Sequence, residues 1–383
     1  MPELPPSAAV VVVGGGIVGA SVAYHLATAG VRPVVLIERG LFGSGSSSRA
    51  AGGIRQQFSS EVNVRLSIES VKFYQRFEQL LGIDVGFRQC GYLFLLTNGR
   101  DWKASQRNAL MQRSLSVPVQ LLDRNGIARL VPQLRLDDVL GATYCPTDGF
   151  ADPGSAVEGF LAGARRAGAV TLDQTAVRGI GTDDGRVAVV QTAAGEVRTP
   201  AVVNCAGAFA ASVGRMVGLE LPVLPYRRQI YVTEPFDGLP GAYPMTIDFG
   251  TKFYFRREGA GVLMGMDDPT EPSGEDTATT TAFLERLIAA AVSRVPVLEQ
   301  ARVRTGWGGL YEVTPDHSPL LGETEVPGFY CACGFSGHGF MHAPAAGKVI
   351  SELITRGASE PDVSELSPLR LAEGRAHHES AVI

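Results

Sequence analysis

The sequence predicts an α/β fold in which a Rossmann-like dinucleotide-binding domain is interleaved with a β-rich substrate domain. A buried strand, a glycine-rich turn and a helix open the chain, and the same pattern closes it. A second buried strand enters a small-residue turn in mid-chain, and β-rich segments lie between these patterns. We therefore expect discontinuous domains, with residues 1–85, 150–220 and 305–383 in the first and residues 86–149 and 221–304 in the second.

The opening stretch predicts a complete βαβ nucleotide-binding unit. Val10–Val13 are β-branched and predict a strand that is buried on both faces. GGGIVG at residues 14–19 has the G-x-G-x-x-G spacing, which allows a tight turn, close approach of a pyrophosphate and helix–strand contact. Glu38 ends the next apolar run, where a carboxylate accepts hydrogen bonds from a ribose. This unit predicts a bound dinucleotide and disfavours NADP, but alone it does not distinguish FAD from NAD.

Composition excludes several classes of partner. The chain has 383 residues, 45% of them hydrophobic and 19% charged, with a formal net charge of −5 and no basic run. This balance argues against nucleic acid and anionic membranes. The N-terminus has no basic region and only a short apolar run, so we expect no membrane span and a cytoplasmic location. Five scattered cysteines predict buried thiols rather than disulfides, and Cys331 and Cys333 lack a second pair for a metal site.

Helical and strand patterns alternate along the rest of the chain. Residues 41–53 are small and polar, and form either a flexible connection or a source of hydrogen-bond donors for a ligand. Asp152 followed by Pro153 predicts a helix start. We expect helices over residues 59–81 (capped by Ser59 or Ser60), 101–114, 153–168, 279–294 and 340–354, and strands over residues 91–97, 201–205, 228–233, 252–255, 262–266 and 328–333.

Four stretches together make the sequence similar to the D-amino-acid-oxidase superfamily of FAD enzymes, and most to its sarcosine oxidase branch. They are GGGIVGAS…ERG at the start, VVNCAGAFA in the middle, and GLYEVTPDHSPLLG and GFSGHGFMHAPAAGKVISELI near the end. They extend across nearly the whole chain. The resemblance implies FAD rather than NAD, and oxidation of the C–N bond of an amino acid.

The resemblance also implies roles for individual residues. Arg55 matches the arginine that holds the substrate carboxylate, a role that suits a guanidinium fork; the alternative is a surface or phosphate-side arginine. Tyr311 matches an active-site tyrosine beside the flavin, or else is a half-buried core residue. His338 lies in the turn that passes the flavin ring, which it either touches or supports. Arg55, Tyr311 and His338 are the expected catalytic residues, and Tyr254 and Met341 join them around the substrate.

The expected cofactor-binding residues come from the glycine turns, the Ser-rich loop and the matching strand ends. They are Gly14, Gly16, Ile17, Val18, Gly19, Glu38, Arg39, Ser46, Ser47, Ser48, Val177, Ala206, Gly207, Gly309, Gly334, Ser336, Gly337, His338, Gly339 and Phe340.

Three positions depart from the sarcosine oxidase pattern. Gly309 stands where that branch has its flavin-linking cysteine, so we expect FAD to be bound non-covalently. Met341 replaces a lysine that helps to bind the carboxylate. Leu263 stands approximately where those oxidases carry the lysine that activates O2, and an apolar residue there makes rapid reaction with O2 doubtful.

The sequence thus favours an FAD enzyme that oxidises a small amino acid, such as sarcosine, another secondary or N-methyl amino acid, or a D-amino acid. The amine's own lone pair stabilises the developing iminium, so no strong base is needed. The electron acceptor is O2 or another molecule, and a homo-oligomer or a partner subunit is compatible. Two alternatives remain open: oxidation of a 2-hydroxy acid with His338 as base, and a flavin-bearing subunit or assembly factor.

Overall fold

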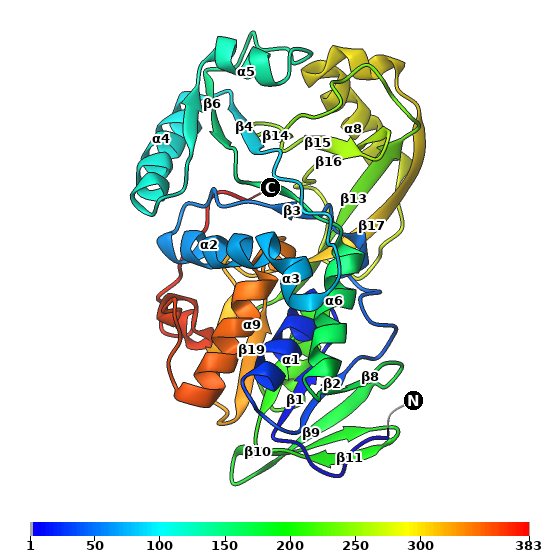
Figure 1. Ribbon diagram of the computed structural model, residues 1–383, viewed down its shortest axis with the longest axis vertical. Coiled ribbons are helices and arrows are strands. Elements are labelled where there is room, and N and C mark those ends of the chain that lie inside the picture. The colour runs from blue at the N-terminus through cyan, green and yellow to red at the C-terminus, as the bar shows by residue number, and fades with distance from the viewer. Residues whose placement is uncertain (1–2, 383) are drawn as a thin grey trace.

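The structure is a computed structural model that describes residues 3–382. Figure 1 shows an elongated molecule with one sheet in its lower half and another in its upper half, and α2 (Glu61–Gln75) lies across the middle. The mixed arrangement of helices and sheets confirms the predicted fold class.

The lower half is built on a six-stranded sheet with the order β18-β19-β12-β1-β2-β8. β1 pairs in parallel with both β2 and β12, and β18 alone runs antiparallel at one edge. The strands are β1 (Val10–Val13), β2 (Val34–Ile37), β8 (Val170–Leu172), β12 (Val202–Asn204), β18 (Leu320–Glu323) and β19 (Phe329–Cys333).

Both faces of this sheet are covered, which explains its continuous apolar strands. Val10 and Val12 pack towards a helical layer, whereas Val11 and Val13 pack towards a small three-stranded sheet on the other face. The helical layer contains α1 (Ile17–Thr28), α6 (Pro153–Arg166) and α9 (Gly339–Arg356). The other face is covered by β9 (Val177–Asp183), β10 (Arg186–Thr192), β11 (Gly195–Arg198) and α7 (Ala210–Arg215).

The upper half is an eight-stranded sheet with the order β17-β13-β16-β15-β14-β4-β6-β5. One face packs on α5 and α8, and the other face turns Tyr92, Ile230, Met245 and Tyr254 towards the lower half. The elements are β4 (Tyr92–Leu96), α4 (Gly99–Ser114), β5 (Gln120–Leu122), α5 (Arg124–Leu130), β6 (Gly141–Cys145), β13 (Leu224–Thr233), β14 (Met245–Asp248), β15 (Tyr254–Glu258), β16 (Gly261–Gly265), α8 (Thr281–Arg294) and β17 (Val303–Val313).

Most predicted elements are found, with informative differences at their ends. Asp152 caps α6 by accepting the Ser155 N–H at 2.7 Å, as predicted. The helix predicted over residues 59–81 is instead two helices, α2 and α3 (Phe77–Leu81), because the chain leaves helical geometry at Arg76. The predicted domain boundaries stay a prediction; β17, which spans the boundary at residue 305, pairs within the eight-stranded sheet.

Among residues 3–382, no helix is both long and apolar enough to cross a membrane. The five cysteines are free thiols, and all but Cys90 are buried. The same residues include no cluster of three or more His, Cys, Asp or Glu side chains suited to a metal ion.

A buried ion pair fixes the C-terminal segment to the lower half. The fully buried side chains of Arg370 and Asp316 form two hydrogen bonds of 2.8 Å each. Burial alone would raise the pKa of Asp316, but the hydrogen bonds from Arg370 outweigh it and lower this pKa to about 2. Asp316 also accepts the His377 N–H at 2.9 Å. The chain beyond residue 370 is thus attached to the six-stranded half.

We expect Asp316→Asn to lower the free energy of unfolding at pH 7 by about 3–5 kcal/mol, because it leaves the Arg370 charge buried without an anion. Since its pKa falls from 3.8 to about 2 on folding, Asp316 stabilises the protein fully above its unfolded pKa, and this contribution disappears as the pH falls through about 2. Urea unfolding at several pH values measures both effects. The matched control is Asp237→Asn at an exposed position; equal stability of Asp316→Asn and the parent protein would contradict the prediction.

Candidate cofactor and substrate site

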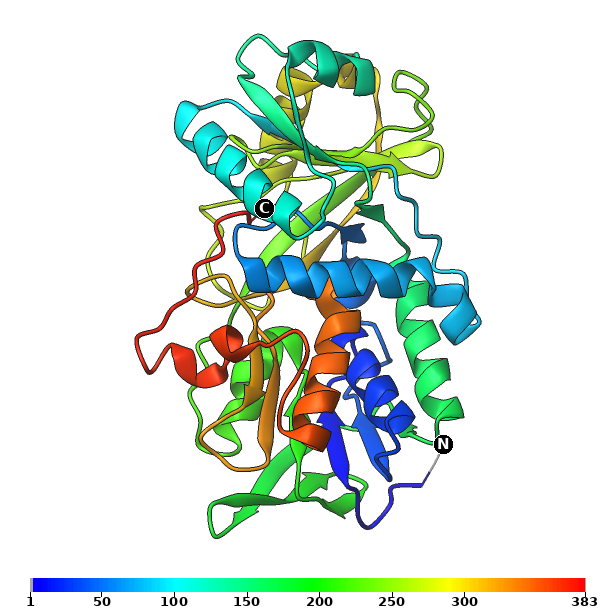
Figure 2. The same ribbon diagram turned by 60° about the vertical axis from the view of Figure 1, so that its left-hand side comes forward.

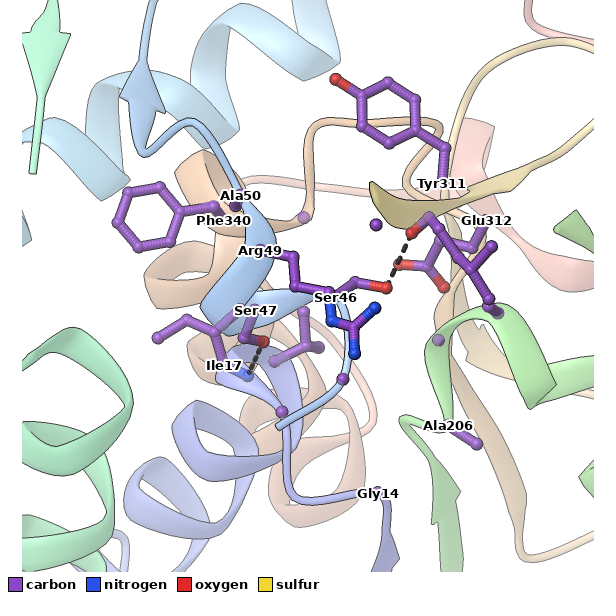
Figure 3. A pocket seen from close by; sticks show the side chains of 18 of the residues that line it. Gly14, Ile17, Ser46, Ser47, Arg49, Ala50, Ala206, Tyr311, Glu312 and Phe340 are labelled. Carbon is purple, nitrogen blue, oxygen red and sulfur yellow. Dashed lines mark hydrogen bonds between the residues drawn. The ribbon is translucent and has the colours of Figure 1, made fainter. Parts of the chain in front are cut away.

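One elongated cavity of about 690 Å³ extends from the end of β1 to the inner face of the eight-stranded sheet. The first helix turn, the Ser-rich loop and the turn before α9 line its lower part, and β13, β15 and β17 line its upper part. Figure 3 shows Gly14 and Ile17 at one side of this space and Tyr311 and Glu312 at the other. The cavity therefore joins the nucleotide motif to the β-rich half.

The glycine motif forms the expected cradle. Gly14 has a φ of +108°, and a Cβ there would lie 2.4 Å from the Cys205 carbonyl oxygen. A Cβ on Gly19 would lie 1.8 Å from the Gly14 carbonyl oxygen, so only glycine allows α1 to meet the turn this closely. The Glu38 carboxylate accepts the N–H groups of Gly15 at 2.7 Å and Gly40 at 2.8 Å. It is thereby held next to the turn, at the edge of the cavity.

The Ser-rich loop closes over the cavity as an ordered connection between the two halves. Ser47 Oγ accepts the Ile17 N–H at 2.9 Å, and Ser46 Oγ donates to the Leu310 carbonyl at 2.7 Å (Figure 3). The Arg49 guanidinium donates to the Gly308 carbonyl at 2.9 Å, while the Trp307 indole donates to the Arg49 carbonyl at 3.0 Å. Of the two predicted interpretations of residues 41–53, hydrogen-bond donors beside a ligand fit this geometry.

Arg49 also fills the space beside Gly309. A Cβ on Gly309 would lie 3.1 Å from the Arg49 Cβ, which is tighter than ordinary contact. The position lines the cavity but offers no side chain to a cofactor. A thioether bond from this residue is chemically impossible.

Most predicted cofactor residues line the cavity. Those that do are Gly14, Gly16, Ile17, Val18, Glu38, Arg39, Ser46, Ser47, Val177, Ala206, Gly207, Gly309, Gly337, His338, Gly339 and Phe340. Four predicted residues are not among the lining residues: Gly19, Ser48, Gly334 and Ser336. The Gly334 N–H donates to the Glu312 carboxylate at 2.9 Å, and Ser336 Oγ lies 3.3 Å from Thr314 Oγ1.

The structure brings the three expected catalytic residues together at the upper end of the cavity. Arg55, Tyr311 and His338 all line it, and an Arg55 guanidinium nitrogen lies 3.0 Å from His338 Nε2. Tyr254 and Met341, expected around the substrate, line it as well. Arg55 is 1% exposed, and its carbon Cζ lies 3.9 Å from the centre of the Phe58 ring. We call this region the amino-acid end.

Burial and charge determine the protonation of this end. Burial, reinforced by the Arg55 charge, lowers the pKa of His338 well below its usual value. The neutral ring accepts the Arg55 N–H at Nε2, so its proton is on Nδ1, which has no hydrogen-bond partner among the described residues. Burial raises the pKa of Tyr311 despite the nearby Arg228 charge. Neutral donors and fixed cations therefore surround this space.

Sequence reasoning missed several residues of the amino-acid end. Tyr92, Ile230 and Met245 line it from β4, β13 and β14. These side chains resemble ordinary strand core in the sequence, and only strand pairing places them at the cavity. Arg228 was not missed, since the sequence offers it with Arg227 as the carboxylate clamp if Arg55 serves the cofactor. It lines the amino-acid end, pairs with Asp267 at 2.6 Å, and has its guanidinium 5.2 Å from the centre of the Tyr311 ring.

Leu263 lies behind the cavity wall. It is 1% exposed on β16 and packs in the cluster that contains Tyr92, Ile230, Met245 and Tyr254, and it is not among the lining residues. Glu312, next to Tyr311 on β17, also lines the cavity; burial raises the pKa of its carboxyl to about 7, against the lowering effect of the Gly334 and Phe335 N–H groups. Glu38, Glu275 and Glu312 are the carboxylates among the described residues that line the cavity.

The donor set fits a flavin dinucleotide. The glycine cradle and the N-terminus of α1 suit a pyrophosphate, and Glu38 suits a ribose. Near Glu38, the Arg39 guanidinium lies 3.7 Å from the centre of the Phe209 ring and stacks on it. The N-terminus of α9 and the turn containing Gly337 face the opposite part, where a flavin ring would lie beneath the amino-acid end.

Known proteins share this architecture. The FAD-dependent oxidoreductase family named DAO matches residues 9–353. Mitochondrial sarcosine dehydrogenase of Mus musculus is 33% identical over 376 residues, which are 94% of this chain and 41% of that protein. The chain therefore spans about two fifths of the length of this curated relative.

Two crystal structures superpose over nearly the whole chain. L-proline dehydrogenase from P. horikoshii has a TM-score of 0.92 and 35% identity, covering 98% of this chain and 100% of that one. Glycine oxidase from Geobacillus kaustophilus has a TM-score of 0.84 and 28% identity, covering 96% and 99% respectively.

We expect Glu38→Gln to weaken FAD binding by about one to two orders of magnitude, because charge-assisted hydrogen bonds to a ribose are worth roughly 1.5–3 kcal/mol. Turnover by the FAD-loaded fraction should change less. Titration of apoprotein with FAD, followed by flavin fluorescence, measures the effect against Glu158→Gln, an exposed carboxylate on α6. Unchanged FAD affinity would mean that Glu38 does not contact the ribose.

Proposed function

This chain belongs to the DAO family of FAD-dependent oxidoreductases, and we propose that it oxidises the C–N bond of a small secondary amino acid to an imine. The family confirms the resemblance expected from the sequence, and with it FAD as the cofactor. L-proline dehydrogenase and sarcosine dehydrogenase, named for secondary amino acids, are among the similar proteins. A proline-like or N-methylglycine-like substrate is therefore the class we propose.

The observation that supports this proposal most is the buried Arg55 at the amino-acid end. Arg55 is 1% exposed, and within residues 3–382 the groups to which its guanidinium donates hydrogen bonds are uncharged. A buried cation without a hydrogen-bonded anion favours an anionic ligand. A substrate carboxylate would meet this demand with a charge-assisted, bidentate pair.

The same electrostatics favours the reactive form of the amine. Arg55, Tyr254 and Tyr311 are buried, and removal from water disfavours a charged ammonium relative to the neutral amine. Tyr254 and Tyr311 add neutral hydroxyl groups that can orient the substrate. A neutral amine has the lone pair that stabilises an iminium as hydride leaves the adjacent carbon, so this end needs no carboxylate base.

The protein must also align the C–H bond of the substrate with the flavin. Bound FAD supplies the two-electron acceptor for the hydride that leaves the carbon beside nitrogen. Arg55 would hold the carboxylate, and the turn containing Gly337 and the N-terminus of α9 would hold the flavin ring. A fixed distance between these two supports would bring the C–H bond into a reactive position.

Oxidation of a 2-hydroxy acid is less well supported. That reaction needs a base for the hydroxyl proton, and His338 is the expected candidate. However, its Nε2 already accepts an Arg55 N–H, and burial with the adjacent charge lowers its pKa well below the usual value. A weakly basic, engaged imidazole favours the amine reaction.

Anaerobic flavin bleaching tests the proposal. The FAD-loaded protein is mixed with L- and D-proline, N-methylglycine, glycine and a set of 2-hydroxy acids, and the flavin absorbance is followed. We expect a secondary amino acid to bleach the flavin fastest. Bleaching by hydroxy acids alone, or by none of the compounds, would contradict the proposal.

We expect Arg55→Met to raise KM for the amino acid by roughly 30-fold or more, because removal of one partner of a buried charge pair costs about 2–5 kcal/mol. FAD content should be unchanged. Arg65→Met is the matched control, since Arg65 is exposed on α2. If Arg55→Met loses FAD instead, Arg55 serves the cofactor, and Arg228 is the remaining arginine at this end.

We also expect electrons to leave the protein faster to a quinone or another artificial acceptor than to O2. A fixed, unpaired cation beside the flavin would favour the anion formed from O2. Arg228 is already paired with Asp267, Arg55 would be paired with the substrate, and Leu263 is apolar.

Stopped-flow mixing of substrate-reduced protein with air-saturated buffer measures reoxidation. Met245→Lys, which adds an ammonium at a lining position, should accelerate it, whereas Ile288→Lys on the exposed side of α8 should not. Reoxidation by O2 as fast as turnover, with stoichiometric H2O2, would identify an oxidase and contradict this prediction.

A further inference from the structure

The last described residues, 377–382, run to the amino-acid end. The segment leaves the lower half at Asp316, whose backbone carbonyl accepts the Glu379 N–H at 2.9 Å. Figures 1 and 2 show the C-terminal segment in red, with its end between α2 and α4. The amino-acid mechanism proposed above uses none of these residues.

Glu379 anchors this segment at the start of α2. Its carboxylate is 1% exposed and accepts hydrogen bonds from the Ser59 N–H at 2.8 Å, from Ser60 Oγ at 3.0 Å and from Asn63 Nδ2 at 3.1 Å. Ser59 Oγ in turn accepts the Ser380 N–H at 2.9 Å. Ser60, one of the two predicted caps of α2, makes no side-chain cap of its own. The start of this helix is therefore bound to residues more than 300 positions away.

Beyond the anchor, the segment engages two cations through its backbone. The Ala381 carbonyl accepts a hydrogen bond from the Arg55 guanidinium, and the Val382 carbonyl accepts one from Lys252 Nζ at 3.0 Å. Both acceptors are uncharged. A carboxylate is the stronger acceptor for a guanidinium, so a substrate and Ala381 would compete for the same donors.

A second cavity of about 280 Å³ lies on the outer side of this contact. Ser380, Ala381, Gln57 and Phe94 line it on one side. The same inner wall contacts Arg55, because the guanidinium donates to the Gln57 carbonyl and lies 5.6 Å from the centre of the Phe94 ring. α4 lines the other side, through Arg100, Asp101, Ala104, Ser105, Arg107 and Asn108.

We propose that residues 380–382 are a gate between this outer cavity and Arg55, and that Glu379 is the positioning residue that holds the gate closed. In the closed state the Ala381 carbonyl occupies the Arg55 guanidinium. In the open state a carboxylate reaches Arg55 through the outer cavity and replaces that carbonyl. The gate deepens the proposed function, because it assumes that Arg55 binds the carboxylate of the substrate.

Competition of this kind has a measurable signature. When only a fraction of molecules is open, the apparent affinity for the ligand falls by that fraction, so one open molecule in ten weakens binding about tenfold. Loss of the gate should therefore strengthen carboxylate binding. A segment that merely stabilised the fold would leave it unchanged or weaken it.

The experiment titrates the FAD-loaded protein with pyrrole-2-carboxylate, which resembles a cyclic secondary amino acid but carries no oxidisable C–H bond beside nitrogen. The change in flavin absorbance gives Kd. Deletion of residues 379–383 should lower this Kd about tenfold. Pyrrole-2-carboxamide, the neutral analogue, should bind equally to both proteins, because it does not compete as an anion for Arg55.

Single substitutions test the gate without deleting any residue of the segment. Glu379→Gln should also lower the Kd for pyrrole-2-carboxylate. Its control is Glu373→Gln, which replaces an exposed carboxylate of the same segment and should leave this Kd unchanged. Ser59→Ala removes hydrogen bonds to Glu379 and Ser380 without a change of charge and should lower Kd about threefold. Its control is Ser364→Ala, whose hydroxyl bonds only to exposed Asp362.

Unchanged or weaker carboxylate binding in Glu379→Gln and Ser59→Ala would overturn the gate, as would equal strengthening for the amide. The result is separable from the proposed function. If amino acids bleach the flavin and these variants have no effect, the gate alone fails. If the variants strengthen carboxylate binding while no amino acid bleaches the flavin, the proposed reaction fails and the gate remains.

Discussion

The amino-acid end is organised around one buried positive charge. Burial lowers the pKa of Arg55, and the negative charges of Glu379 and Asp148 oppose this effect without bonding to the guanidinium directly. An arginine keeps its proton even so, and the cost of holding the charge away from water must be met by its surroundings. The neighbouring features meet this requirement: a neutral histidine accepts one hydrogen bond from Arg55, and two backbone carbonyls accept others.

The position of Arg55 also depends on the contacts that its neighbours in sequence make with residues 148–150. Arg55 follows a two-residue strand, Gly53–Ile54, which pairs with Gly149–Phe150. The next residue, Gln56, donates its N–H to the fully buried Asp148 carboxylate at 2.9 Å. Burial raises the pKa of Asp148 to about 6, although hydrogen bonds from Gln56 and Gln57 lower it. A negative charge near the guanidinium thus also fixes the backbone that carries it.

Local patterns predicted the parts of this protein that local chemistry determines. The glycine turn at residues 14–19, the Asp152 cap and the helix after Gly339 depend on neighbours in sequence, and all three were found as expected. The candidate residues Arg55, Tyr311 and His338 were identified through the family resemblance, not through a local pattern. The structure places all three at one cavity.

The rest depends on contacts between distant segments, which no local pattern reveals. Ser60 has the residue type of a helix cap, yet its hydroxyl donates to Glu379 instead of accepting an N–H of the first turn. Met245 and Ile230 resemble core positions until strand pairing turns them towards the cavity. Leu263, in contrast, was expected near the flavin and is packed behind the wall.

The order of strands in the six-stranded sheet has a consequence for how the chain must be made. β1 is synthesised long before its neighbour β12, which lies near residue 203, and before the next strand, β19, near residue 331. Until each partner is synthesised, an apolar strand with unpaired backbone groups remains exposed at an edge, where it can associate with other chains. Contacts this distant in sequence also slow folding. The sheet that holds the nucleotide motif is therefore completed only after residue 333 has been synthesised, and the nascent chain needs protection from aggregation until then.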